Sequence, residues 1–300
     1  MDKQNILVIG SANADLVIHT DRLPKLGETI IGKNFAVNAG GKGLNQAVAI
    51  SKLGGKVSFF GAVGDDSNGN MLLDTLKDFG VDFVGNKVSN ISTGTAVITV
   101  IGGDNVIILN AGANDTITPD FIEKNTNLIK KAGFVVLRLE IPIKTVVKIC
   151  EIAKQSNTTV ILNPAPYKQL PDCIFQMIDY IIPNEHEAQD ITGITLDGNE
   201  NCICAVEKLK NLGVKNVIIT LGERGCVYNA GDKIIFNPAL PTTVIDTTSA
   251  GDSFIGALTT KLAETCTLFD AIAFATKVAA ITISREGAAK SIPFSQEISL

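Results

Sequence analysis

Uninterrupted apolar runs alternate along this chain with amphipathic stretches. The runs at 6–9, 57–60, 134–139, 160–162, 180–182 and 217–220 predict strands that are apolar throughout. Strands of this kind are typical of parallel sheets that are covered on both faces. Helical patterns lie between them, at 44–53, 69–79, 119–129, 143–155, 185–192 and 202–212. The alternation predicts right-handed βαβ units in a three-layer α/β/α fold with a mainly parallel central sheet.

Two segments break this rhythm. Residues 14–38 hold extended pieces around Leu23-Pro24 and Gly27-Glu28, and residues 95–109 have the pattern of a hairpin that turns at 102–105. Strands without intervening helices cannot easily join a parallel sheet. We therefore expect a small separate β-sheet, either a lid over the active face or a dimer contact, within a single domain that spans residues 1–300.

Charge and apolar content exclude several classes of partner. The chain has 31 acidic and 26 basic residues and no basic run, which argues against nucleic acid and anionic membranes. The first residues lack the apolar stretch of a signal peptide, and the run 268–283 is too short and too charged to span a membrane. Six cysteines without zinc spacing, most of them in apolar contexts, indicate buried reduced thiols in a cytoplasmic protein.

The segment Asp246-Thr-Thr-Ser-Ala-Gly-Asp252 carries the strongest chemical signal. It precedes an amphipathic run and predicts a tight turn that opens a helix, with the N–H groups of Ala250 and Gly251 left free. Free N–H groups and the positive end of the helix dipole form an anion site. Asp252 could accept the proton of a substrate hydroxyl, so the pattern suits phosphoryl transfer to an alcohol. For a lone Asp, an ordinary N-cap would be the alternative.

A second glycine cluster, Gly40-Gly41-Lys42-Gly43-Leu44-Asn45, lacks the spacing of a phosphate-binding P-loop. It could mark only a tight turn, or it could be bare backbone that lets a small polyol approach, with Asn45 offering its amide. Asn13 and Asp15 follow the first strand, and Glu140 ends another. Open α/β sheets bind ligands at these carboxyl ends, although Asx turns would also explain Asn13 or Asp15 taken singly.

Two further loops end strands. Asn184 and Glu187 are three residues apart at a helix start, so both could face hydrated magnesium on phosphates. An acidic first turn is equally a helix-dipole device. Residues 220–225 are either a glycine turn before a hairpin or one wall of a nucleotide slot. With two histidines in the chain, nucleophilic Ser-His-Asp or Cys-His chemistry is not indicated.

Taken in order, these pieces resemble the ribokinase branch of the PfkB carbohydrate kinase family, from Ile6 to Pro293. The segments 40–45 and 246–252 are similar to the two signatures of that family. Residues 10–15, 163–166, 183–185 and 220–225 match further family segments at family-like distances. The resemblance implies a ribokinase-like α/β domain with a β-sheet lid.

The resemblance also implies a role for each matching residue. Asp252 is similar to the catalytic base, and Ala250 and Gly251 to the anion hole for the γ-phosphate. The sugar-binding positions are Asn13, Asp15, Gly41, Lys42, Asn45, Glu140 and Asp252. The ATP-binding positions are Asn184, Thr220, Gly222, Gly225, Gly251 and Thr276.

Two cations are implied in the same way. Glu187 completes an Asn-x-x-Glu element that is tied indirectly to magnesium. The activating monovalent cation of the family, usually potassium, would lie by Asp246, Thr248, Thr282, Arg285, Gly287 and Ser291, mostly on backbone carbonyls. Departures are few: Ser249 stands where Gly or Ala is frequent, and Thr276 where a larger side chain is frequent.

The expected activity is ATP-dependent phosphorylation of D-ribose at O5, giving ribose 5-phosphate and ADP. Asn13 favours ribose because the deoxyribose kinases tend to have Met at this position. The alternatives are a kinase for 2-deoxyribose, another sugar or a nucleoside, and a non-catalytic sensor of the same fold. A nicotinamide-dependent dehydrogenase fits the alternation but lacks the glycine fingerprint. By family analogy we expect a homodimer through the lid.

Overall fold

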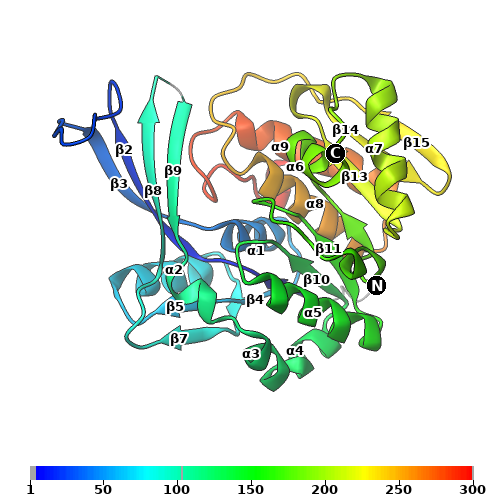
Figure 1. Cartoon of the computed structure of the whole chain (residues 1–300), viewed down its shortest axis with the longest axis horizontal. Helices are drawn as coiled ribbons and strands as arrows, with labels where there is room; N and C mark the ends of the chain where they lie inside the picture. Colours follow the sequence, from blue (N-terminus) through cyan, green and yellow to red (C-terminus); the bar gives the residue numbers. More distant parts are fainter. Residues whose placement is uncertain (1–4, 103, 299–300) are drawn as a thin grey trace.

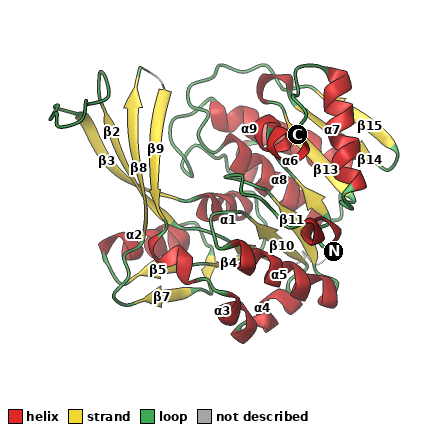
Figure 2. Ribbon diagram, in the orientation of Figure 1, coloured by secondary structure: helices red, strands yellow, loops and turns green. Residues whose placement is uncertain are grey.

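A central sheet forms the middle layer of the computed structural model, which describes residues 5–102 and 104–298 (Figures 1 and 2). Within these residues nine strands pair in the order β15-β14-β13-β12-β11-β10-β1-β4-β6. All neighbours are parallel except β13–β14 and β14–β15. The strands are β1 (Ile6–Ile9), β4 (Val57–Phe60), β6 (Asp82–Phe83), β10 (Phe134–Leu137), β11 (Thr159–Leu162), β12 (Tyr180–Ile181), β13 (Asn216–Thr220), β14 (Cys226–Ala230) and β15 (Lys233–Asn237).

Helices cover both faces of this sheet, so the predicted three-layer fold is confirmed (Figure 2). One face packs on α1 (Lys42–Lys52), α2 (Ser67–Asp78), α8 (Ala250–Ala263) and α9 (Leu268–Ile283). The other packs on α3 (Pro119–Lys124), α4 (Thr126–Lys131), α5 (Ile143–Ser156), α6 (Glu185–Thr192) and α7 (Asn199–Asn211). Successive side chains of a strand point to opposite faces. Ile6 and Val8 of β1 therefore enter the first core, and Leu7 and Ile9 the second.

The strand order reverses at β1. The chain runs from β1 to its neighbour β4 on one side, and later returns to place β10 on the other side. In open α/β sheets the crevice at such a switch point, beyond the carboxyl ends of the strands, is where ligands bind. The loops that follow β1 and β10 are therefore the first place to look for a site.

The expected small separate sheet is present. It has four strands in the order β3-β2-β8-β9, with bounds β2 (Asn13–His19), β3 (Lys33–Gly40), β8 (Gly94–Ile101) and β9 (Asp104–Asn110). Figure 1 shows it projecting from the body of the molecule beside the N-terminal end of α1. A two-stranded sheet, β5 (Ala62–Gly64) with β7 (Asn86–Val88), lies near its base. Gly103, in the middle of the expected hairpin turn, lies outside the described residues.

Several local expectations were wrong. The predicted helix 119–129 is two helices, because Asn125 leaves the helical conformation at φ −118° and its side chain donates to the Phe121 carbonyl. The pieces around Leu23-Pro24 and Gly27-Glu28 are not strands but part of the connection between β2 and β3. Of the six cysteines, all free, only Cys150, Cys202 and Cys226 are buried.

Short 3₁₀ helices occupy some of the connections, at Gly112–Thr116, Asp172–Gln176, Gly222–Arg224 and Ser295–Glu297. Among the described residues there is no helix with the length and apolar character needed to cross a bilayer.

Candidate active site at the switch point

Asp252 lies in the first turn of α8 and faces α1 and the end of β10. Its side chain is 8% exposed. Oδ1 accepts hydrogen bonds from Arg138 Nη1 and from Gln46 Nε2 at 3.3 Å, and Oδ2 accepts one from Asn45 Nδ2 at 3.4 Å. Asp252 is therefore not an N-cap. It is a buried carboxylate held entirely by polar groups, in the crevice that the switch point defines.

The turn before α8 differs in one respect from the expectation. Ala250 N–H donates to the Thr247 carbonyl at 3.2 Å, so this amide is not free as predicted. Among the described residues, no acceptor is found for the backbone N–H groups of Gly251 and Asp252. Gly251 is exposed. These two amides at the positive end of α8 are the ones available to an anion.

Ser249, the N-cap of α8, has left-handed backbone geometry with φ 63°. Side chains other than glycine, asparagine and aspartate rarely adopt this region. The Ser249 hydroxyl is buried and has no partner among the described residues. Its position at the helix start places an unused hydroxyl close to the free amides.

The glycine cluster lies at the start of α1, where its backbone packs directly against the backbone of residues 10–13. Gly41 has φ 89°, and a Cβ there would lie 2.7 Å from Asn13 N and 2.9 Å from Ser11 O. A Cβ on Gly43 would lie 2.8 Å from Ser11 N. Both glycines are therefore required by the packing of α1 on the segment after β1. This contact brings Asn45, one turn into α1, next to Asp252.

Asn13, the first residue of β2, is 5% exposed, and the described hydrogen bond to its side chain is made at its carbonyl oxygen. Its Oδ1 accepts from Asn114 Nδ2 at 2.8 Å. A Cβ on Gly94 would collide with both amides, at 2.3 Å from Asn13 Oδ1 and 2.2 Å from Asn114 Nδ2. Since the carbonyl of Asn13 is occupied, its NH₂ group is the part left to donate to a ligand.

Asp15 and Glu140 form an acidic pair beside this amide. Glu140 Oε2 accepts from the Ser11 hydroxyl and from the Lys42 backbone N–H at 3.2 Å, so the carboxylate lies at the positive end of α1. Burial, followed by the nearby charge of Glu140, raises the pKa of Asp15 to about 7, although the positive charge of Lys42 opposes the rise. The side chain of Asp15 fits only because residue 40 is glycine, where a Cβ would lie 2.0 Å from Oδ2.

Asn184 and Glu187 form a capping box at the start of α6. Asn184 Oδ1 accepts from Glu187 N–H at 2.8 Å, and Glu187 Oε2 accepts from Asn184 N–H at 2.9 Å. The helix-terminus interpretation therefore holds for both residues. Burial raises the pKa of Glu187. The hydrogen bond from Asn184 and the positive charges of Arg138 and Lys42 oppose that rise, and Asp252 adds to it. Glu187 thus belongs to the same charged cluster as Asp252.

The remaining residues that were predicted to bind ATP lie along the carboxyl end of β13 and across to α9. Thr220 ends β13, and residue 184 bridges to it. Gly222 has φ 57° with open space around it, whereas a Cβ on Gly225 would lie 2.1 Å from Asn237 O. Thr276 of α9 accepts a hydrogen bond from Asn237 Nδ2 at 2.9 Å. Residues 220–225 and Thr276 are therefore linked through Asn237.

Asp246 ties the predicted cation loops together. Its carboxylate accepts from Thr248 N–H at 2.8 Å and from Gly287 N–H at 3.0 Å. Burial would raise the pKa of Asp246, but these hydrogen bonds outweigh burial and lower it. The hydroxyls of Thr282 and Ser291 donate to backbone carbonyls. Arg285 pairs with Glu297. The described residues contain no cluster of three or more acidic, His or Cys side chains fit for a metal.

Arg138 and Gln46 have a direct contact with Asp252 that the sequence prediction missed. Arg138 is the one charged residue within the run 134–139, whose other members are apolar and predict a buried strand. Its position one residue after β10 was the available signal. Asn114 also lacked a distinguishing motif, because its contact with Asn13 spans 101 residues of sequence.

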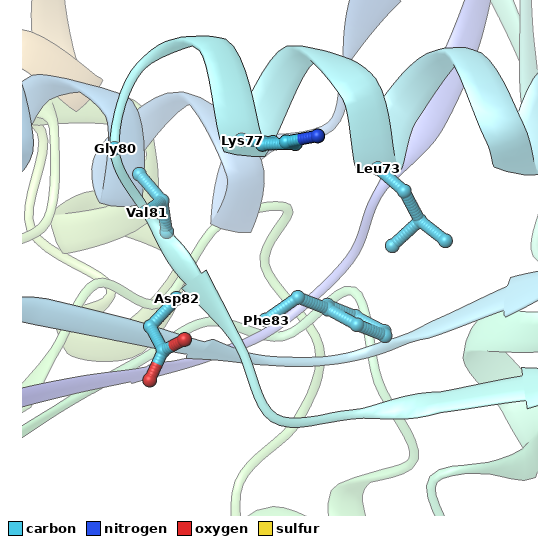
Figure 3. A pocket seen from close by; sticks show the side chains of 6 residues that line it. All are labelled: Leu73, Lys77, Gly80, Val81, Asp82 and Phe83. Carbon is cyan, nitrogen blue, oxygen red and sulfur yellow. The ribbon is translucent and has the colours of Figure 1, made fainter.

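A hollow of about 460 Å³ lies elsewhere, between the end of α2 and β6. Figure 3 shows Leu73 and Lys77 of α2 on one side of it and Phe83 of β6 on the other. None of its lining residues belongs to the charged cluster around Asp252. It therefore does not compete with the switch-point crevice as the candidate site.

Comparison with known proteins identifies the family of the chain. The family model described as pfkB family carbohydrate kinase matches residues 3–295. The chain belongs to this family of carbohydrate kinases.

Individual relatives are similar over almost the whole chain. The ribokinase of Schizosaccharomyces pombe is 41% identical over 98% of this chain and 96% of its own length. The deoxyribokinase of Salmonella typhi is 34% identical over 96% and 95% of the two chains. Among solved structures, Arabidopsis thaliana ribokinase complexed with ribose and ATP has a TM-score of 0.94 at 33% identity, covering 99% of this chain and 98% of that one.

Proposed function

We propose that this protein transfers the γ-phosphoryl group of ATP to O5 of D-ribose. The observation that carries the proposal is the buried carboxylate of Asp252 beside two unbonded amides at the start of α8. A base next to an anion site is what phosphoryl transfer to an alcohol requires. The family membership and the similarity to ribokinases supply the class of substrate.

The residues divide the work as follows. Asp252 accepts the proton of the sugar hydroxyl as its oxygen attacks the γ-phosphorus in line. The N–H groups of Gly251 and Asp252 stabilise the charge on the transferred group. Asn13, Asp15 and Glu140 orient the sugar by its other hydroxyls. Closure of the β2–β3–β8–β9 sheet, acting as a lid, excludes water that would otherwise accept the phosphoryl group.

The remaining assignments concern ATP and the cations. We assign Asn184, Thr220, Gly222, Gly225 and Thr276 to ATP, Gly41, Lys42 and Asn45 to the sugar side, and Glu187 to magnesium through water. Mg²⁺ on the phosphates would neutralise their charge during transfer. The carboxylate of Asp246 accepts from two N–H groups and so holds the loops around residues 246–248 and 287 together. Backbone carbonyls of these loops, rather than this carboxylate, would then bind the monovalent cation.

An ADP-release assay tests the proposed substrate. We expect D-ribose to give the highest kcat/KM among ribose, 2-deoxyribose, fructose and adenosine, and potassium to increase the rate. Asn13→Met should lower kcat/KM for ribose by about 10–100-fold, since a buried hydrogen bond to a hydroxyl is lost, and affect 2-deoxyribose less. A preference of the wild-type protein for 2-deoxyribose, or no ADP release with any sugar, would contradict the proposal.

Sugar binding should depend on pH through Asp15. A carboxyl with a pKa of about 7 is protonated below that pH and loses acceptor capacity for sugar hydroxyls. The ionised fraction then falls about tenfold per pH unit, so KM for ribose should rise as pH falls below 7. KM measured from pH 5.5 to 8.5 checks this. In Glu140→Gln the midpoint should move to lower pH, and a flat wild-type profile would show that Asp15 does not act this way.

We also propose that the small sheet joins two copies of the chain. Its strands expose apolar side chains, including Phe35 at 64%, Val97 at 43% and Ile108 at 68%. Patches of this kind on monomers are rare outside interaction sites. Light scattering should give twice the chain mass, and Ile108→Asp should shift the protein towards monomer. A wild-type mass of one chain at micromolar concentration would rule out the dimer.

A further inference from the structure

Arg138 is a buried cation at the centre of the candidate active site. It follows β10 directly, two residues before Glu140, and its side chain is 3% exposed. Buried arginines need a compensating partner, because an isolated charge is costly to remove from water. The partner is Asp252 of α8, which lies 114 residues further along the chain.

The contacts of Asp252 are divided between its two oxygens. Arg138 and Gln46 both bond Oδ1, whereas Oδ2 has only the long contact of 3.4 Å from Asn45. Both amide contacts, 3.3 Å from Gln46 and 3.4 Å from Asn45, are longer than the usual range of N–H···O hydrogen bonds. The guanidinium of Arg138 is therefore the principal partner, it bonds Oδ1, and Oδ2 has room for a closer donor. We propose that Arg138 is a positioning residue, which fixes Oδ1 so that Oδ2 of Asp252 faces the sugar hydroxyl. This inference rests on the proposed kinase function.

The physical reason for such a residue is the freedom of an aspartate side chain. The terminal torsion of Asp has broad minima, so an unheld carboxylate rotates easily. A misplacement of about 1 Å in a reacting group can lower a rate by about 10²-fold. The guanidinium of Arg138 bonds Oδ1, and the longer contact from the Gln46 amide of α1 reaches the same oxygen, so this oxygen is held while the other faces the crevice.

Orphaned polar atoms show that the surroundings of this pair are not a closed structural salt bridge. Arg138 Nε, Gln46 Oε1 and Asn45 Oδ1 are buried and have no partner among the described residues. A buried ion pair kept only for stability would be expected to satisfy its remaining hydrogen-bonding groups. Three unused polar groups around one carboxylate indicate a polar space that a substrate hydroxyl or water fills.

The experiment compares two substitutions at this position in the full-length protein. Arg138→Met removes the donor, and we expect kcat to fall by about 10–100-fold with KM for ribose and ATP within about threefold. Arg138→Gln keeps an amide donor and should retain kcat within about tenfold of wild type, and above that of the Met variant. The control is Lys148→Met on α5, which breaks the partly exposed ion pair with Glu123 of α3 and should leave kcat and both KM values unchanged.

A double variant separates positioning from direct contact with the phosphoryl group. If Arg138 acts through Asp252, Asp252→Asn/Arg138→Met should be no more than about twofold slower than Asp252→Asn alone. This variant removes both charges of the buried pair, so it provides the test even where the single Met variant does not fold.

Several outcomes would overturn the inference. One is a fall in kcat of the double variant equal to the product of the two single falls. Another is an equal fall in kcat in the Met and Gln variants, or an unchanged kcat in the Met variant. A selective rise in KM for ATP would also contradict it. Failure of the proposed function is distinguishable, because the wild-type protein would then release no ADP with ribose.

Discussion

Asp252→Asn is expected to lower kcat by about 10²–10⁴-fold, because a correctly placed general base contributes an effect of this size. The amide has nearly the same shape but cannot accept the proton of the sugar hydroxyl. Binding of ATP should persist, since the amides of Gly251 and residue 252 remain in place. Single-turnover assays and ATP titration measure the two properties separately.

The matched control is Asp270→Asn at the start of α9. Asp270 lies in the first turn of a neighbouring helix, outside the site. Its carboxylate accepts a hydrogen bond from the Thr267 hydroxyl, and its backbone N–H donates to the same hydroxyl oxygen. The Asp270→Asn substitution should leave kcat within about twofold of wild type, because substitutions at surface positions generally have small effects. The Asp252 variant should also melt at a lower temperature, because Arg138 loses its charged partner. A kcat within threefold of wild type in Asp252→Asn would remove Asp252 from the role of base.

Gly41→Ala is expected to destabilise the fold by about 2–5 kcal/mol. Left-handed geometry costs about 1–2 kcal/mol for a residue with a Cβ, and overpacking adds about 1–3 kcal/mol. Here φ is 89°, and the new Cβ would lie 2.7–2.9 Å from backbone atoms of residues 11–13. Any relief must move α1, and with it Asn45 and Gln46. Chemical denaturation measures the free energy of unfolding.

Gly193→Ala separates the two causes. Gly193 ends α6 with φ 70°, and a Cβ there would meet nothing within 4 Å. Gly193→Ala should lower the free energy of unfolding only by the cost of the backbone conformation, about 1–2 kcal/mol. Equal destabilisation of the two variants would show that the close approach of α1 to the segment after β1 is unimportant.

The sequence was sufficient to predict the layered fold because its strands are buried on both faces. A run such as Ile6–Ile9 places side chains in two hydrophobic cores, so every residue of it is apolar. Such a pattern can be recognised from the sequence without knowledge of tertiary contacts. Helix boundaries were also predicted closely where caps are local, as at Glu185–Thr192. The break at Asn125 was missed, because the apolar pattern continues across it while the side chain bonds back to the Phe121 carbonyl.

The candidate site was only partly predictable. Glycine and acidic motifs located Gly41, Asp15 and Asp252, since each has a signature within a few residues. The partners of these groups come from distant segments. Arg138 and Asn114 carry no local signature, and their contacts exist only once β10 and the loop after β9 are in place. The free amide expected at Ala250 was wrong because a turn bond to Thr247 depends on the φ 63° of Ser249.

The candidate active-site crevice draws on segments near residues 13, 45, 138 and 252. The crossing from β1 to β10 and the packing of α1 on α8 bring these segments together. During translation, a ribosome would therefore have to release most of the polypeptide before any turnover could begin. Shortened chains that stop before the last two helices should be inert, whatever sugar they are given. Contacts between residues so far apart in sequence also predict slow folding. Until synthesis is complete, the nascent chain would expose apolar surface and would need protection from aggregation.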